Sequence, residues 1–395
     1  MKNNLKRILS FTLVLLMVLT AVFMVGCSKK EEGGEAPVNK IDPPVGRNDF
    51  IGSIGGVSET YKGAVSEESY STPNEAAEAF VATEVVGDST AVISGTQSMG
   101  TLSTAEVSGL NLPAEISAGI VQVEKMEVSY SLANSEAVKR SKGVTSVDTL
   151  NTNKKVIVYV IKYENNWKYF SPMPVTGSTI TKSYYDSVFN AEKYKNCTLE
   201  TSMVMDVTVT GETMKMTVTQ LIKHADGKVY LEQNMDAYGE TDKLCAYMEE
   251  VDGVVKCYIK QGDSTEWYEG YLTTIGFNDL DELTPFYDQY LDYTYFTKTD
   301  FGFELADENA RKYFYTALGE ALESFGSMVD TDNMKVDMYS EYYVSGGVLS
   351  GMRTYAEVDL NMNIQGQSYT MNEIVDSYTK VTNYGTTVVE KPFEE

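Results

Sequence analysis

Apolar and polar residues alternate most strictly over residues 198–273. Successive side chains of a strand point to opposite faces, so this period predicts consecutive antiparallel strands with one buried face. A two-residue turn at Gly211-Glu212 would join the first two strands and place Val209 opposite Met214. The apolar positions that share the predicted face are Met203, Met205, Val207, Val209, Met214, Met216 and Val218.

The period changes after this meander. Asp279 to Tyr290 is predicted as helix or irregular structure, and Asp307 can cap a helix whose apolar stripe runs from Ala310 to Phe325. Long alternating runs with glycine-containing turns then predict three closing strands, at Met334–Val344, Val348–Met362 and Tyr369 to about Val381.

A separate, smaller pattern precedes the meander. Thr72-Pro73-Asn74-Glu75 matches a capping box, and apolar residues at helical spacing follow it. Three strand-like segments come next, Gly119–Ser131, Lys154–Tyr163 and Trp167–Phe170. The prolines and glycine of residues 172–177 mark a boundary. We therefore predict an α+β protein of two domains, residues 71–177 and 178–395, each a largely antiparallel sheet packed on one or a few helices.

The first residues have the pattern of a secretory signal. Lys2, Lys6 and Arg7 precede an apolar run from Ile8 to Cys27, and no stop-transfer pattern follows. We therefore assign residues 1–26 to a signal peptide, in preference to a membrane-spanning helix. Residues 27–70, rich in Glu, Gly, Pro and Lys near their start, are predicted to be a flexible linker.

The end of this segment, Met24-Val25-Gly26-Cys27, resembles the lipobox of bacterial lipoproteins. The resemblance implies cleavage before Cys27, a diacylglycerol on its sulfur, and attachment to the extracytoplasmic face of the cell membrane. The alternative is a secreted protein with a chance cysteine. The polar stretch over residues 28–34 favours the tether instead, because a lipid-anchored domain needs such a spacer.

Two fold resemblances follow from the order of elements. Residues 71–173, with the Ala-Ala-x-x-Phe helix and Trp167, resemble the cone-shaped fold of the nuclear transport factor 2-like superfamily. Residues 178–392 resemble the open half-barrel of lipoprotein carriers of the LolA and LppX type. That resemblance implies a curved sheet around an apolar cavity for acyl chains or lipids. It rests on the element order and on no short motif.

The net negative charge of the chain excludes one class of function, nucleic-acid binding. The chain has 57 acidic and 32 basic residues, and removal of the signal leaves 29 basic residues and a formal charge of about −28. Nucleic-acid binding depends on clustered Lys and Arg, so we exclude it. The acidic surface is read as a source of solubility.

Cysteine use indicates no disulfide framework. A turn at Asp252-Gly253 would place Met248 opposite Cys257, and Cys245 on the other side of the sheet. We therefore expect Cys197, Cys245 and Cys257 to be buried free thiols.

Candidate catalytic and metal sites are sparse. The single histidine, His224, stands beside Asp226-Gly227 and is expected in an exposed turn, without a catalytic role. Zinc sites require several close His or Cys ligands, which are absent. Residues 330–341 faintly resemble a calcium loop, but Lys335 occupies the position that needs glycine. We expect no enzyme, no metal and no cofactor.

The functional hypothesis rests on the properties of the methionine and tyrosine side chains. Met adapts to irregular ligands, and Tyr offers a flat face with a polar tip. The leading hypothesis is a non-enzymatic binding lipoprotein that holds an apolar ligand or a lipidated partner against the seven-residue face listed above. The alternatives are a structural or protein-interaction module of the envelope with a dry sheet interior and, less favoured, an extracellular hydrolase.

Overall fold

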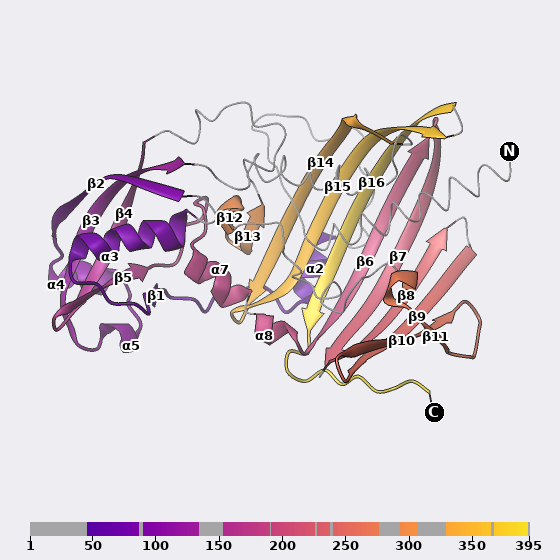
Figure 1. The fold of residues 1–395 in the computed structure, drawn as a ribbon, viewed down its shortest axis with the longest axis horizontal. Coiled ribbons are helices and arrows are strands. Elements are labelled where there is room, and N and C mark those ends of the chain that lie inside the picture. The colour runs from indigo at the N-terminus through magenta and orange to yellow at the C-terminus, as the bar shows by residue number, and fades with distance from the viewer. Residues whose placement is uncertain are drawn as a thin grey trace. The chain divides into compact units, whose positions relative to one another are not determined.

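The computed structural model describes residues 46–86, 90–133, 153–189, 191–225, 227–237, 240–275, 293–305, 329–364 and 367–393. The predicted signal peptide, Cys27 and the elements expected over residues 279–290 and 307–325 lie outside these ranges. The chain is mostly antiparallel strand, in two sheets, with short helices (Figure 1). It divides into two compact units, of which the smaller holds Ser58–Val188 and Asp292–Phe303.

The smaller unit contains a sheet of strand order β1-β5-β4-β3-β2. Its strands are β1 (Ala64–Val65), β2 (Thr90–Thr101), β3 (Ile120–Ala133), β4 (Lys154–Tyr163) and β5 (Asn166–Ser171), and β12 (Phe296–Thr299) also belongs to this unit. Its helices are α3 (Pro73–Phe80), the π-helical turn η1 (Val81–Val85), α4 (Thr104–Gly109), α5 (Ala114–Ser117), α7 (Lys182–Val188) and the 3₁₀ turn η5 (Tyr293–Tyr295).

Helix α3 begins as its sequence predicts. The Thr72 hydroxyl accepts a hydrogen bond from the Glu75 amide at 3.2 Å, and the Glu75 carboxylate accepts one from the Thr72 amide at 3.1 Å. This confirms the capping box. The apolar stripe of the helix, including Ala76 and Phe80, packs on strand residues such as Met126 and Val158. Burial of that stripe holds the helix on the sheet.

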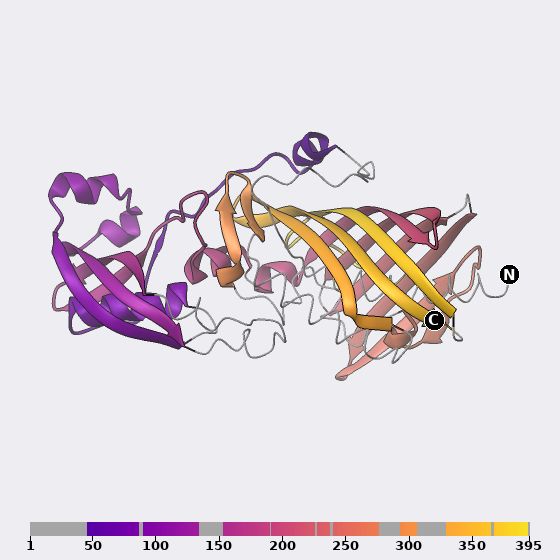
Figure 2. The same cartoon turned by 90° about the horizontal axis from the view of Figure 1, so that it is seen from above.

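The larger unit is built on a long meander. Its strands lie in the order β11-β10-β9-β8-β7-β6-β16-β15-β14. Their bounds are β6 (Cys197–Val209), β7 (Glu212–Ala225), β8 (Lys228–Ala237), β9 (Glu240–Val251), β10 (Val254–Gln261), β11 (Tyr268–Gly270), β14 (Val329–Ser345), β15 (Val348–Ile364) and β16 (Gln367–Thr382). Strand β13 (Gly302–Leu305) pairs with β12, and the remaining short elements are α8 (Ala191–Tyr194) and the 3₁₀ turn η3 (Leu272–Ile275). Figure 2 shows β14, β15 and β16 bending along their length.

The register of the first hairpin differs from the prediction. The turn is Thr210-Gly211, with φ of 50° and 87°, so Val207 lies opposite Met214 and Met205 opposite Met216. Turns of type I′ need positive φ at both central residues, and glycine favours the second position. The predicted pairing of Val209 with Met214 is therefore wrong by two residues. A shift of two keeps every side chain on its predicted face.

The second hairpin has the predicted register. Met248 lies opposite Cys257, and Cys245 lies opposite Lys260. Cys197, Cys245 and Cys257 are buried free thiols, as expected.

Helix α2 (Arg47–Ser53) occupies part of the segment predicted to be flexible linker. The Arg47 Nε donates to both carboxylate oxygens of Glu341, at 3.0 and 3.1 Å. The Phe50 ring packs on Gly351, where a Cβ would lie 2.8 Å from the ring. Packing against β14 and β15, rather than its own sequence, therefore stabilises this helix. No helix among the described residues has the length and apolar character needed to cross a membrane.

Candidate functional site

The seven predicted site residues lie together on adjacent strands of the larger unit, Met203, Met205, Val207 and Val209 on β6 and Met214, Met216 and Val218 on β7. We call the sheet face that carries them the methionine face. Val209 is half-buried, and the other six are at most 8% exposed. Alternation along each strand brings their side chains to one side of the sheet.

The methionine face continues across the neighbouring strands. Strand β16 pairs with β6, and β15 pairs with β16. Residues opposite one another in these pairs share a face, so Val375 of β16 and Ala356 of β15 lie on the same face as Met205. On the other side, Val218 lies opposite Met235 of β8. The buried apolar residues that extend the face on β15 and β16 are Ala356, Val358, Leu360, Met371 and Val375.

One acidic residue stands among these apolar side chains. Glu373 of β16 lies opposite Val207 of β6 and Val358 of β15. It is 0% exposed, and neither of its carboxylate oxygens has a hydrogen-bond partner. Burial raises the pKa of the Glu373 carboxyl to about 8, because an apolar environment disfavours the charged form.

Two other buried acids among the described residues, Glu84 and Asp376, have hydrogen-bond partners. In the smaller unit, Glu84 accepts hydrogen bonds from the Ser183 amide at 2.8 Å and the Ser183 hydroxyl at 2.7 Å. It also accepts from the Ser171 hydroxyl at 3.2 Å. In the larger unit, Asp376 receives Nε and Nη2 of Arg353 at 3.1 and 3.0 Å. Among the described residues, Glu59 and Asp206 each have one buried oxygen without a partner, and Glu373 is the one acid that has two. Because buried polar groups are normally paired, Glu373 needs an explanation.

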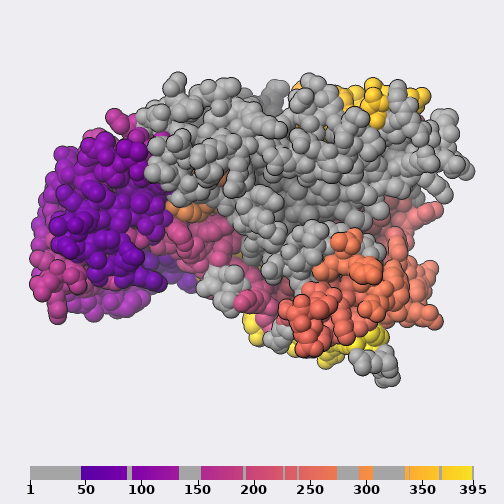
Figure 3. Space-filling view, viewed as in Figure 1, coloured from indigo at the N-terminus to yellow at the C-terminus, as the bar shows by residue number. Residues whose placement is uncertain are grey.

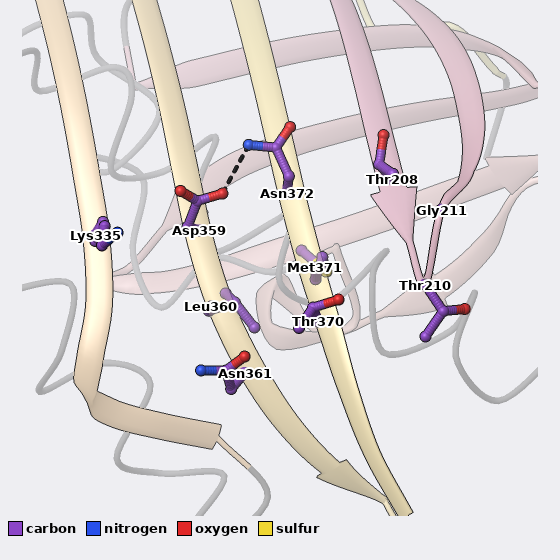
Figure 4. A pocket seen from close by; sticks show the side chains of 10 residues that line it. All are labelled: Thr208, Thr210, Gly211, Lys335, Asp359, Leu360, Asn361, Thr370, Met371 and Asn372. Carbon is purple, nitrogen blue, oxygen red and sulfur yellow. Dashed lines mark hydrogen bonds between the residues drawn. The ribbon is translucent and has the colours of Figure 1, made fainter.

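The opposite face of the sheet is polar. Near the β6–β7 turn it holds a hollow of about 340 Å³, lined in part by Thr208, Lys335 and Asp359. Figure 4 shows Asn372 pointing toward Asp359, and its amide donates to that carboxylate at 2.8 Å. This hollow lies on the face opposite the seven predicted residues.

His224 differs from its prediction. It lies in β7 rather than in an exposed turn, opposite Cys197 and Val229, and it is 5% exposed. The prediction of an exposed turn was wrong because β7 runs on to Ala225, beyond the position at which the sequence suggested a turn.

Metal binding has no support in the described residues. They contain no group of three or more His, Cys, Asp or Glu side chains placed to hold an ion. The stretch that faintly resembles a calcium loop lies in the extended strand β14, where Glu341 is paired with Arg47.

The sequence reasoning missed Glu373, although a signal was present. Met371, Glu373 and Val375 fall on the same phase of the alternating strand. A charged residue on the apolar phase predicts an acid that points into the buried face.

Comparisons with known proteins give no family. No family model and no curated protein matches the sequence. A solved structure of a DUF1329 family protein from Desulfovibrio piger is 8% identical, with 54% of this chain and 96% of that chain covered and a TM-score of 0.21. The Pseudomonas aeruginosa protein OpdO is 9% identical, with 66% and 90% covered and a TM-score of 0.12. Likenesses at these TM-scores carry no information on function.

Proposed function

We propose that this chain is a non-enzymatic binding protein of the cell envelope, anchored to the membrane through a lipidated Cys27. An apolar ligand, or the acyl chains of a lipidated partner, binds at the methionine face of an open half-barrel. The observation that carries the proposal is the group of buried Met and Val side chains on one face of β6, β7 and β16, interrupted only by Glu373 among the described residues from Met371 to Val375.

Methionine suits this role better than other apolar residues. Its unbranched, polarizable side chain adjusts to ligands of irregular shape. Met205 and Met216 are register partners, and Met203 and Met214 lie one step away along the same two strands. Four flexible side chains on neighbouring strands give a surface that can accommodate acyl chains of different lengths.

The chemistry of the thiols favours binding over catalysis. Burial raises the pKa of Cys197 to about 12 and that of Cys257 to about 11. At neutral pH both remain protonated, and a protonated thiol is a poor nucleophile. These cysteines act as small apolar residues in the sheet.

The linker suits an anchored binding protein. About 20 residues separate Cys27 from helix α2, and the flexible linker that the sequence predicts here would span on the order of 25 Å. Such a tether keeps the protein at the membrane surface and leaves it free to turn toward a lipid or a partner.

Native mass spectrometry tests the proposal. A soluble form that begins at Ser28 is purified under gentle conditions from the envelope of its own cell. We expect an additional bound mass that organic extraction removes. Met216→Lys should abolish it, whereas Thr217→Lys, at the exposed neighbouring position, should retain it. Circular dichroism establishes that the Met216→Lys and Thr217→Lys proteins are folded. The double substitution Met205→Leu/Met216→Leu is a milder change of the same face, because it introduces no charge. A protein that always carries no bound mass contradicts the proposal.

A second candidate function is a protein-interaction module with a dry sheet interior. It is favoured by exposed apolar side chains near one sheet edge, with Val254, Tyr268 and Tyr271 at 62%, 48% and 79% exposure. The segment that holds them, residues 240–275, forms part of the surface drawn in salmon and orange in Figure 3. Crosslinking on intact cells at introduced cysteines near Tyr271 distinguishes this function, since a ligand-binding protein need not yield a specific partner there.

A further inference from the structure

Glu373 has surroundings in the sheet that supply it with no partner. Its neighbours on the methionine face are Val207 and Val358 across the two flanking strands, and Met371 and Val375 along its own. On β6, β15 and β16, no titratable side chain lies on this face within two register positions of Glu373. On β7 the exposed Glu212 lies on the same face beside the turn, opposite Val209. Burial is the only cause of its raised pKa, which agrees with the absence of a nearby charge.

Fold stability does not explain this residue. An unpaired polar group in an apolar environment costs free energy that an isosteric apolar side chain would not. For the two buried acids Glu84 and Asp376, the same chain supplies hydrogen-bond donors. An acid with both oxygens free, on a face otherwise suited to acyl chains, therefore indicates a partner from outside the chain.

We propose that Glu373 is the polar recognition residue of the methionine face, where its carboxyl O–H donates a hydrogen bond to an ester carbonyl oxygen of an acylated lipid. This inference rests on the proposed function and specifies the ligand. The acyl chains would lie along the methionine side chains, and the ester group would lie beside Glu373 on β16. Glu373 would thereby fix how far the lipid enters.

The protonation state selects a carbonyl over an ammonium group. With a pKa near 8, the Glu373 carboxyl is mostly neutral at pH 7 and carries one O–H donor. A carbonyl oxygen accepts that proton in a hydrogen bond without placing any charge in the apolar face. An ammonium ligand would first require ionisation of Glu373 and then the burial of an ion pair.

Two matched fluorescent probes test the inference. One is the methyl ester of a pyrene-labelled long-chain fatty acid, and the other is a pyrene-labelled alkane of the same length. At pH 6 we expect the wild-type protein to bind the ester about tenfold more tightly than the alkane, the value of one buried hydrogen bond. At pH 9.5 this preference should largely disappear, because the ionised Glu373 has no proton to donate.

Substitutions isolate the side chain. Glu373→Gln keeps an N–H donor and loses the titration, so it should retain the ester preference at both pH values. Glu373→Leu should bind the two probes equally at both. Glu200→Gln, at an exposed position on the opposite face of the adjacent strand, should behave as the wild type. Circular dichroism checks that each variant is folded.

The outcomes separate this inference from the proposed function. If the folded wild type binds neither probe, the proposed function fails. If both probes bind and the ester preference is the same in the wild type and Glu373→Leu, the methionine face binds apolar ligands but the role of Glu373 is refuted. If a pyrene-labelled alkylamine binds more tightly as the pH rises toward 8, the ionised form is the recognising one, and the choice of a carbonyl is overturned.

Discussion

Replacement of Glu373 by glutamine should change how the stability of the larger unit depends on pH. The pKa of this carboxyl rises from an ordinary value of 4.5 to about 8 in the folded protein. Between these values the folded state holds a proton that the unfolded state has released. Stability of the wild type therefore falls as the pH rises through this window.

The magnitude follows from the shift. One pKa unit corresponds to about 1.4 kcal/mol, so the full shift costs about 5 kcal/mol above pH 8 and about 3 kcal/mol at pH 7. Below pH 4.5 both states are protonated and the cost vanishes. Glutamine does not titrate. The free energy of unfolding of Glu373→Gln, minus that of the wild type, should therefore rise by several kcal/mol between pH 5 and pH 8.

Urea unfolding of the delipidated protein measures this difference. The chain has two tryptophans, Trp167 in the smaller unit and Trp267 in the larger one. In a Trp167→Phe background, fluorescence reports the larger unit alone. Glu200→Gln, a substitution at an exposed position, should give a curve parallel to the wild type. If the Glu373→Gln curve is also parallel to the wild type from pH 5 to pH 8, Glu373 is not a buried neutral acid and the reasoning fails.

Three further substitutions test the packing. Gly351→Ala would place a Cβ 2.8 Å from the Phe50 ring, so it should lower the free energy of unfolding of the larger unit, measured in urea, by about 1–3 kcal/mol and expose helix α2 to protease. Arg353→Met leaves Asp376 buried without its ion pair and should cost about 3–5 kcal/mol, whereas the double substitution with Asp376→Leu should recover most of that loss. Thr72→Ala removes the helix cap and should cost about 1 kcal/mol in thermal unfolding of the smaller unit, with Thr72→Ser nearly neutral.

Local patterns predicted most of the strands, because alternation and turn chemistry are properties of short segments. They missed β2 (Thr90–Thr101), a polar segment rich in small residues. The Asp252-Gly253 turn fixed the β9–β10 register, and the capping box fixed the start of α3. The β6–β7 register was missed because the turn was placed at Gly211-Glu212. The preference of type I′ turns for glycine in second place would have selected Thr210-Gly211.

Helix α2 could not be predicted from its own sequence. It is short, and Gly46 at its N-cap provides no side-chain cap. Its stability comes from Phe50 and Arg47 against residues almost 300 positions away, such as Glu341. No local signal encodes a contact of that separation.

The role of Glu373 could be predicted only in part from the sequence. Its phase in the strand was readable, and the neighbours that leave it unpaired were not, because they come from β6 and β15. The sequence could therefore indicate an inward acid, and the structure was needed to establish that the described sheet offers it no partner.

The attachment of helix α2 to the larger sheet through Arg47 and Phe50 has a mechanical consequence. In chain order the proposed lipid attachment site, Cys27, comes first, then α2, then Ser58–Val188 of the smaller unit, and then the strands of the larger one. Arg47 and Phe50 hold α2 on β14, β15 and β16, so tension on an anchor at Cys27 would pass through α2 into these three strands. The chain enters the smaller unit only after α2, so this path of force does not run through the smaller unit. If the protein is anchored as proposed, its smaller unit would carry no tension from the membrane while the contacts of Arg47 and Phe50 hold.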